Sequence, residues 1–106
     1  MIPLKTIEEL ISKHSLLEKE LSAGEVDKKL FAEKSKEYSD LNDVIEDAKK
    51  YFSYEKETKD LEKILGDPNT DDEFKAMAET ELKDLKSENE IIEKKLKLFL
   101  LPKDEA

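Results

Sequence analysis

The sequence has few side chains of the kinds that bind metals or act as nucleophiles. His14 is the single histidine and there is no cysteine, so the common zinc sites, which combine several Cys and His ligands, cannot be assembled. His14 lies on the apolar stripe of a helical pattern over residues 4–22. We therefore interpret it as a packed or rim histidine, with a pH-sensitive contact as the alternative.

One stretch has the spacing of a calcium-binding loop. Asp67, Asn69 and Asp71 match its first, third and fifth ligands. The sixth position of such a loop is a glycine and the twelfth a glutamate, whereas this sequence has Asp72 and Ala78. Because the sequence lacks both the glycine and the final glutamate of such a loop, we interpret the acids as helix-capping residues. We predict no metal site and no cofactor.

No set of residues predicts catalysis. A Ser/His/Asp arrangement, a Gly-rich phosphate loop and a nucleophile elbow are all missing from the sequence. Carboxylate pairs are abundant, but they carry no signal in a chain of which 44% is charged. We therefore predict no catalytic residues, and we expect that the chain is not an enzyme.

The charge pattern bears on possible partners. The net charge is −9, and all 19 basic residues are Lys, with no Arg. Proteins that read nucleic acids usually present a basic face and use Arg to contact phosphate and guanine. We therefore expect no independent nucleic-acid binding. The acidic surface is interpreted as serving solubility, with a basic protein partner as the alternative.

Four polar side chains within the helical pattern could still contact a partner. Tyr38 follows the apolar heptad and is predicted to lie in the core. Tyr51 and Tyr54 border a polar stretch and are candidates for a contact surface. Asn89 falls on the apolar seam of the last helical stretch, where a buried Asn usually fixes the register of packing.

The elements that position these residues are predicted to be helices. The sequence has only 2 Gly and 3 Pro, and Leu, Ile, Glu and Lys, which all tolerate helix, dominate it. Apolar residues recur with helical spacing over three stretches, near 4–22, 27–65 and 71–100. We predict an all-α fold, an elongated antiparallel three-helix bundle with a long central helix and a two-helix coiled-coil tip, forming a single domain over residues 1–106.

Boundary residues support these three helices. Side chains suited to capping are Thr6 with Glu9, Asp27, and Thr70 with Glu73 at the N-termini, and Gly24 after the first helix. No Gly or Pro occurs between Val26 and Leu65, so a continuous central helix is predicted. Its weak point is Glu55–Asp60, where the apolar stripe lapses.

The predicted core consists of the seam residues and those that face them: Phe31, Tyr38, Leu41, Ile45, Leu85, Ile92 and Leu96, with Ile7, Leu10, Leu17 and Leu21 opposite. Leu100 and Leu101 end an apolar run just before Pro102. We expect at least one of them to be exposed, because a three-helix bundle gives them no evident partner. The alternative is that both cover the connection over residues 23–26.

The sequence also bears on the compartment. A membrane span needs about 18 consecutive apolar residues, whereas the longest run here is LFLL at 98–101, and the N-terminus lacks a signal pattern. Together with the lack of cysteine, this indicates a soluble protein of a reducing compartment, the cytoplasm or an organelle matrix.

Several segments resemble one protein family. SKEYSDLNDVIE (35–46) is similar to the second-helix region of bacterial-type class I peptide chain release factors, and LFLLPKDEA (98–106) is similar to the Leu-Leu-Leu-Pro-Lys-Asp junction of that family. The junction favours one of the two sister factors over the other. Other matching positions lie between these segments: Tyr51, Tyr54, Asp60, Leu61, Asp67, Pro68, Met77, Ala78, Glu81 and Leu82. A longer connection after Pro68 departs from the pattern.

The resemblance implies that this chain is the N-terminal helical domain of a release factor. The codon-reading domain and the domain with the Gly-Gly-Gln hydrolysis motif would follow it, and residues 101–106 would begin the linker to them. The implied partners are the ribosome, near the base of its stalk, and the remaining domains, which would dock near Leu100 and Leu101. A membrane is not an implied partner.

Two structural alternatives remain open. Spectrin-type spacers are also three helices of about this length, although they usually carry a Trp in the first helix and this chain has none. A regulatory coiled coil that dimerises through the thin tip is the other alternative.

Overall fold

The computed structural model describes residues 1–24 and 26–101, and their regular structure is entirely helical. The helices are α1 (Leu4–Ala23), α2 (Lys28–Asn42), α3 (Ile45–Gly66) and α4 (Asp72–Leu100). The all-α prediction is confirmed. The molecule is elongated, with extents of 61 × 37 × 19 Å.

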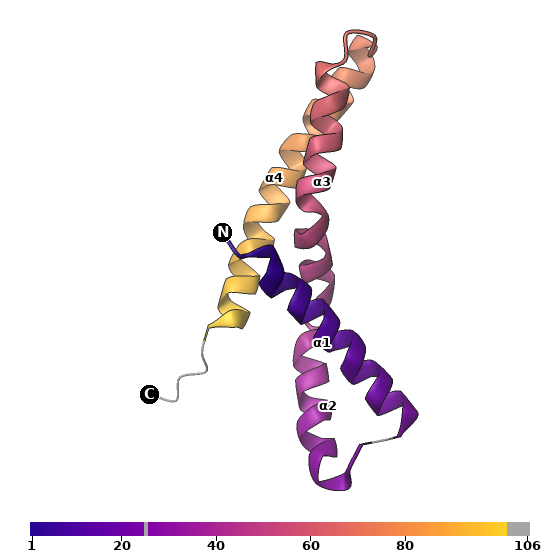
Figure 1. The fold of residues 1–106 in the computed structure, drawn as a ribbon. Helices are drawn as coiled ribbons and strands as arrows, with labels where there is room; N and C mark the ends of the chain where they lie inside the picture. The colour runs from indigo at the N-terminus through magenta and orange to yellow at the C-terminus, as the bar shows by residue number, and fades with distance from the viewer. Residues whose placement is uncertain (25, 102–106) are drawn as a thin grey trace.

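Two pairs of helices make up the bundle (Figure 1). α3 and α4 run antiparallel as a long hairpin, and α1 crosses its lower half. α2 extends the line of α3 and packs against α1. Because α1 is too short to reach the upper half of the hairpin, the tip consists of α3 and α4 alone, as the sequence predicted.

The prediction of one continuous helix over 27–65 is wrong. α2 ends at Asn42 and α3 begins at Ile45, and Val44 between them has φ −120° and ψ 0°, outside the helical region. Asn42, Asp43 and Val44 are three successive residues of modest helix propensity, which helps to explain how a helix can end without Gly or Pro. The expected weak point, Glu55–Asp60, lies inside the unbroken α3.

The caps agree with the sequence in part. Asp27 caps α2 by accepting a hydrogen bond from the Lys29 amide, and Gly24 follows α1 with a left-handed φ of 69°. Both predicted capping boxes are wrong. Pro3 precedes α1 without a side-chain bond, so Thr6 is already inside the helix, and Asp71 rather than Thr70 caps α4.

The core lies where α1, α3 and α4 meet. One buried cluster contains residues from the N-terminus and all three helices: Ile2, Ile7, Ala48, Tyr51, Ile92 and Leu96. Leu17, Leu41 and Ile45 are buried as predicted, and Tyr38, Leu85, Leu10 and Leu21 are partly buried. Phe31 contradicts the prediction, since it is 52% exposed. It lies in the first turn of α2, which packs mainly on α1 and makes no contact with α4.

Candidate functional site

His14 joins α1 to α2 through polar and aromatic contacts. Its Nε2 lies 2.7 Å from Asn42 Oδ1, and its ring stacks on Tyr38 with centroids 4.8 Å apart. Because Asn42 Oδ1 can only accept, Nε2 carries the proton and donates. The Tyr38 hydroxyl donates in turn to Glu18 Oε2 at 3.1 Å. His14 is buried, so its interpretation as a packed histidine is confirmed.

The bond to Glu18 also affects the titration of Tyr38. Partial burial of the ring is the main cause that raises the pKa of Tyr38, and the hydrogen bond to the Glu18 carboxylate adds to it. Tyr38 is half-buried rather than fully in the core. The contacts of these residues hold α1 and α2 together: His14 with Asn42 and Tyr38, and Tyr38 with Glu18. We therefore assign this cluster a structural role.

Tyr51, a candidate for a contact surface from the sequence, is buried instead. It is buried in the core cluster, where its hydroxyl donates to Glu93 Oε2 at 2.7 Å and accepts from the Ile2 amide at 3.1 Å. Burial first, and then the bond to Glu93, raises the pKa of Tyr51. The same bond lowers the pKa of Glu93, with smaller help from Lys97 and the N-terminal ammonium. Tyr54 is half-buried.

Asn89 lies partly buried on α4 and lines a hollow that also contains Tyr51 and Tyr54 of α3. Its Oδ1 is buried and accepts no hydrogen bond from any described residue. A buried acceptor without a donor destabilises the folded state, which fits a residue retained for packing register. That role remains a prediction.

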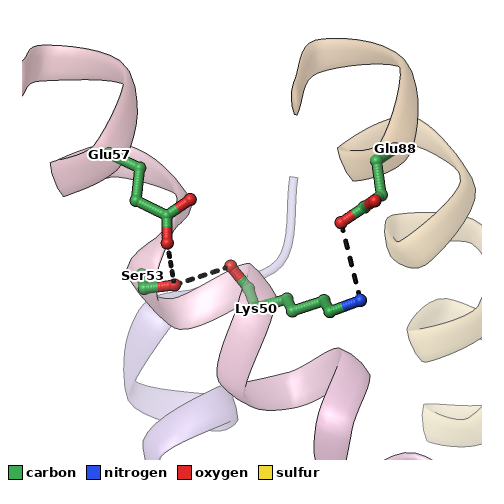
Figure 2. A network of polar contacts seen from close by, with 4 residues as sticks. All are labelled: Lys50, Ser53, Glu57 and Glu88. Atoms are coloured by element: carbon green, nitrogen blue, oxygen red, sulfur yellow. Dashed lines mark hydrogen bonds and ion pairs between the residues drawn. The ribbon is translucent and has the colours of Figure 1, made fainter. Parts of the chain in front are cut away.

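A polar network crosses from α3 to α4 near the middle of the hairpin (Figure 2). Lys50 Nζ lies 3.7 Å from Glu88 Oε1, and Ser53 Oγ lies 3.2 Å from both the Lys50 carbonyl oxygen and Glu57 Oε1. The Lys50 and Glu88 side chains are more than half exposed. A pair in this setting contributes little stability and no special reactivity, so we do not assign it a site.

The capping interpretation holds for one acid of the calcium-like stretch: Asp71 caps α4, whereas the Asp67 side chain bonds within the connection between α3 and α4. Asp67 Oδ1 accepts from the Asn69 amide at 2.9 Å, and Asp71 Oδ1 accepts from the Glu73 amide at 3.5 Å. Within residues 1–24 and 26–101, His, Asp and Glu side chains nowhere gather in a group of three that could hold a metal ion.

Apolar side chains are exposed at both ends of α4. Leu98 is 70% exposed and Leu101 is 59% exposed, whereas Leu100 packs partly against the core cluster. The prediction that at least one of Leu100 and Leu101 is exposed is confirmed, and the alternative that both are covered is wrong. At the hairpin tip, Phe74 and Met77 are also largely exposed.

The end of α4 also borders a cleft that sequence reasoning missed. The cleft has a volume of about 550 Å³ and lies between α1, α2 and the last turns of α4. Its lining residues are Leu10, Lys13, Glu37, Asp40, Leu41, Asp43, Leu98, Phe99 and Leu101. We refer to these residues as the α2–α4 cleft. Its apolar and charged lining makes it a candidate interaction surface.

Comparisons with known proteins place these surfaces in a family context. Residues 10–106 match the family model of the PCRF domain. The chain is 85% identical over all 106 residues to peptide chain release factor 1 of Pelagibacter ubique, of which it covers 30%. It is 37% identical over 100 residues to peptide chain release factor 1 of Lactococcus lactis subsp. cremoris, of which the match covers 28%.

The relatives are much longer than this chain, which spans less than a third of their length. No solved structure shows a significant match. The family match extends over nearly the whole sequence and contains α2, α3 and α4 entirely. The chain therefore belongs to the PCRF domain family.

Proposed function

We propose that this chain is the N-terminal, ribosome-facing domain of a peptide chain release factor, a protein that ends translation. The observation that carries the proposal is the 85% identity to a release factor 1 over the full 106 residues. The spectrin-like spacer and the dimerising coiled coil are not favoured, because neither accounts for a match to the PCRF domain over residues 10–106.

Within the whole protein, this domain would bind and position rather than catalyse. The two glycines, Gly24 and Gly66, are far apart, so the Gly-Gly-Gln motif that the resemblance implies for hydrolysis does not lie in this segment. The polar side chains of His14 and Tyr51 form hydrogen bonds between helices, His14 with Asn42 and Tyr51 with Glu93. Codon reading and hydrolysis would belong to the parts of the protein that follow.

The chemistry of the surface favours a protein contact on the ribosome. The chain has a net charge of −9 and no Arg, so its surface would repel the phosphates of ribosomal RNA and attract a basic ribosomal protein. The base of the ribosomal stalk, which the family resemblance implies, is the proposed location of this contact.

The two ends of the hairpin would serve different neighbours. The end of α4, with Leu100 and Leu101, leads toward residue 106, and the remaining domains of the protein would dock there. The opposite tip, which exposes Phe74 and Met77, would then be free to reach the ribosome. The proposed ribosome binding would take place in the cytoplasm or in an organelle matrix.

No helix in the described residues is long and apolar enough to cross a membrane.

Site-specific photo-crosslinking on a termination complex tests the proposal. A photoreactive residue replaces Phe74 at the tip of the full-length protein, with Leu30 at the start of α2 as the matched exposed apolar control. We expect position 74 to capture a ribosomal protein of the stalk base and position 30 not to do so. Capture elsewhere on the ribosome, or equal capture from both positions, would contradict the proposed orientation.

A second assay tests whether peptide release requires the parts of the protein that follow this domain. The isolated 106-residue segment should show no stop-codon-dependent release of peptide, whereas the full-length protein should release peptide on stop codons. Release by the segment alone would refute the assignment of this segment as a binding module. No stop-codon-dependent release by the full-length protein would refute the release-factor function.

A further inference from the structure

The α2–α4 cleft is open because α2 leaves the bundle. α2 packs against α1 and touches α3 only near their junction, and it makes no contact with α4 within the described residues. The last turns of α4 therefore face α2 across the cleft. The apolar side chains in it come from all three helices and the residue after α4: Leu10 from α1, Leu41 from α2, Leu98 and Phe99 from α4, and Leu101 directly after it.

The charged residues of the cleft are mostly acidic. The acids are Glu37 and Asp40 of α2 and Asp43 directly after it, and the one lysine in the lining is Lys13 of α1. Lys13 pairs with Glu37 at 2.6 Å, and Asp40 pairs with Lys36 on its own helix. The rim therefore keeps a negative excess around an apolar floor. The complementary occupant is a segment with apolar side chains flanked by Lys or Arg.

The position of α4 points to the rest of the same polypeptide as that occupant. α4 ends at Leu100, between the cleft-lining residues Phe99 and Leu101. The release factors that this chain resembles are more than three times its length. A segment tethered so near the cleft has an effective concentration in the millimolar range, so even a weak contact would be occupied. A second copy is a poorer occupant, because two chains of net charge −9 repel each other.

We propose that the α2–α4 cleft is an interdomain seat, filled in the free full-length protein by an apolar segment with flanking basic residues from the polypeptide that follows residue 106. The inference rests on the part of the proposed function that makes this chain the N-terminal domain of a longer protein, since the occupant belongs to the polypeptide that follows. It goes further by assigning α1 and α2 to the docking surface and by stating the chemistry of the segment.

Photo-crosslinking in the free full-length protein, without ribosomes, tests the inference. A photoreactive residue replaces Leu98 in the cleft, and the matched control replaces Ile91, which is also a large exposed apolar residue of α4 but does not line the cleft. We expect Leu98 to form an intramolecular adduct, several-fold more than Ile91, with a downstream peptide that mass spectrometry shows to be apolar and basic. An adduct with a second copy, an acidic peptide, equal yields or no adduct would overturn the inference.

A charge reversal tests the acidic rim separately. Asp43→Lys should reduce the adduct from position 98 several-fold, because it removes the negative excess of the rim. Glu90→Lys changes the net charge equally at an exposed position of α4 outside the cleft, and it should leave the yield unchanged. Equal reductions by both variants would show a general effect of charge and would contradict the assigned rim.

The two proposals fail in distinguishable ways. Peptide release is measured for the same full-length protein on stop-codon ribosomes. A protein that releases peptide but forms no downstream adduct at position 98 refutes the interdomain seat and leaves the release-factor assignment standing. A protein that forms the adduct but releases no peptide retains the seat as a feature of a longer protein and refutes the proposed function.

Discussion

The molecule joins its helices in two different ways, at the core junction of α1, α3 and α4 and along the α1–α2 arm. The junction is apolar, and its buried cluster includes Ile7 and Leu96, the two largest fully buried side chains. The arm also buries Leu17 and Leu41, but much of its contact is polar. It contains the His14–Asn42 bond, the Tyr38–Glu18 bond and ion pairs of Lys13 with Glu37 and Lys34 with Glu20.

This difference indicates which part carries stability and which part can move. Burial of apolar area stabilises without strict geometry, whereas hydrogen bonds and exposed ion pairs contribute less and depend on direction. We therefore expect the junction to hold the fold together and the arm to open at lower free energy. An arm that opens easily would also let the α2–α4 cleft adapt to an occupant.

The largest expected effect is at the junction. Leu96→Ala removes a side chain with 0% exposure from the core cluster, and it should lower the free energy of unfolding by about 2–5 kcal/mol. Leu98→Ala, the same change two residues away at an exposed position, should stay within about 0.5 kcal/mol of the parent. Chemical denaturation of the 106-residue chain measures both. Similar losses in the two variants would mean that the core is misassigned.

A substitution in the α1–α2 arm should lower the free energy of unfolding by less than Leu96→Ala does. His14→Ala removes the bond to Asn42 and the stacking on Tyr38, which together should lower the free energy of unfolding by about 1–3 kcal/mol. A double-mutant cycle with Asn42→Ala isolates the bond from the stacking. A loss as large as that of Leu96→Ala would remove the distinction between arm and junction.

The polar edge of the junction should respond to acid. The pKa of Glu93 in the folded protein lies below its ordinary value of 4.5, chiefly because Tyr51 donates to its carboxylate. A lowered folded-state pKa contributes stability that is present above pH 4.5 and lost as the pH falls through the folded pKa. Glu93→Gln should therefore flatten this part of the stability profile, measured by denaturation between pH 6 and pH 2. An unchanged profile would show that Glu93 is not coupled to folding.

The smallest expected effect is that of an ion pair in the arm. Glu20→Gln breaks the pair with Lys34, whose two side chains are about 30% exposed, and it should lower the free energy of unfolding by about 0–1 kcal/mol. The difference from the parent should shrink in about 1 M salt, because screening acts on partly exposed charges. A difference that persists in high salt would indicate loss of packing instead of charge.

The sequence was sufficient for the features that depend on neighbours in the chain. The apolar periods of α1 and α4, the Asp27 cap and the left-handed Gly24 were all predicted, because each follows from local spacing and backbone preference. The exposure of at least one of Leu100 and Leu101 was also predicted, since both lie off the seam, and Leu101 is the exposed one.

The features that depend on distant contacts were missed. Tyr51 was a candidate for a contact surface because it borders a polar stretch, yet it is buried and bonds Ile2 near the N-terminus and Glu93 of α4. The interruption at Val44 has neither Gly nor Pro to reveal it. The α2–α4 cleft could not be predicted either, because it exists only where α2 departs from α4.

The closure of the core by Ile7 and Leu96 has a consequence for biosynthesis. These residues come from opposite ends of the chain and pack in one cluster. At roughly 5–20 residues per second, on the order of ten seconds separates the synthesis of one from that of the other. During that interval α4 is incomplete, so only α2 and α3 are available to cover the apolar stripe of α1. Contacts between distant residues form late, so the packing of Ile7 of α1 against Leu96 of α4 should be among the last contacts to form. In the nascent chain, the transient α1–α2 hairpin would protect α1 from aggregation and chaperones.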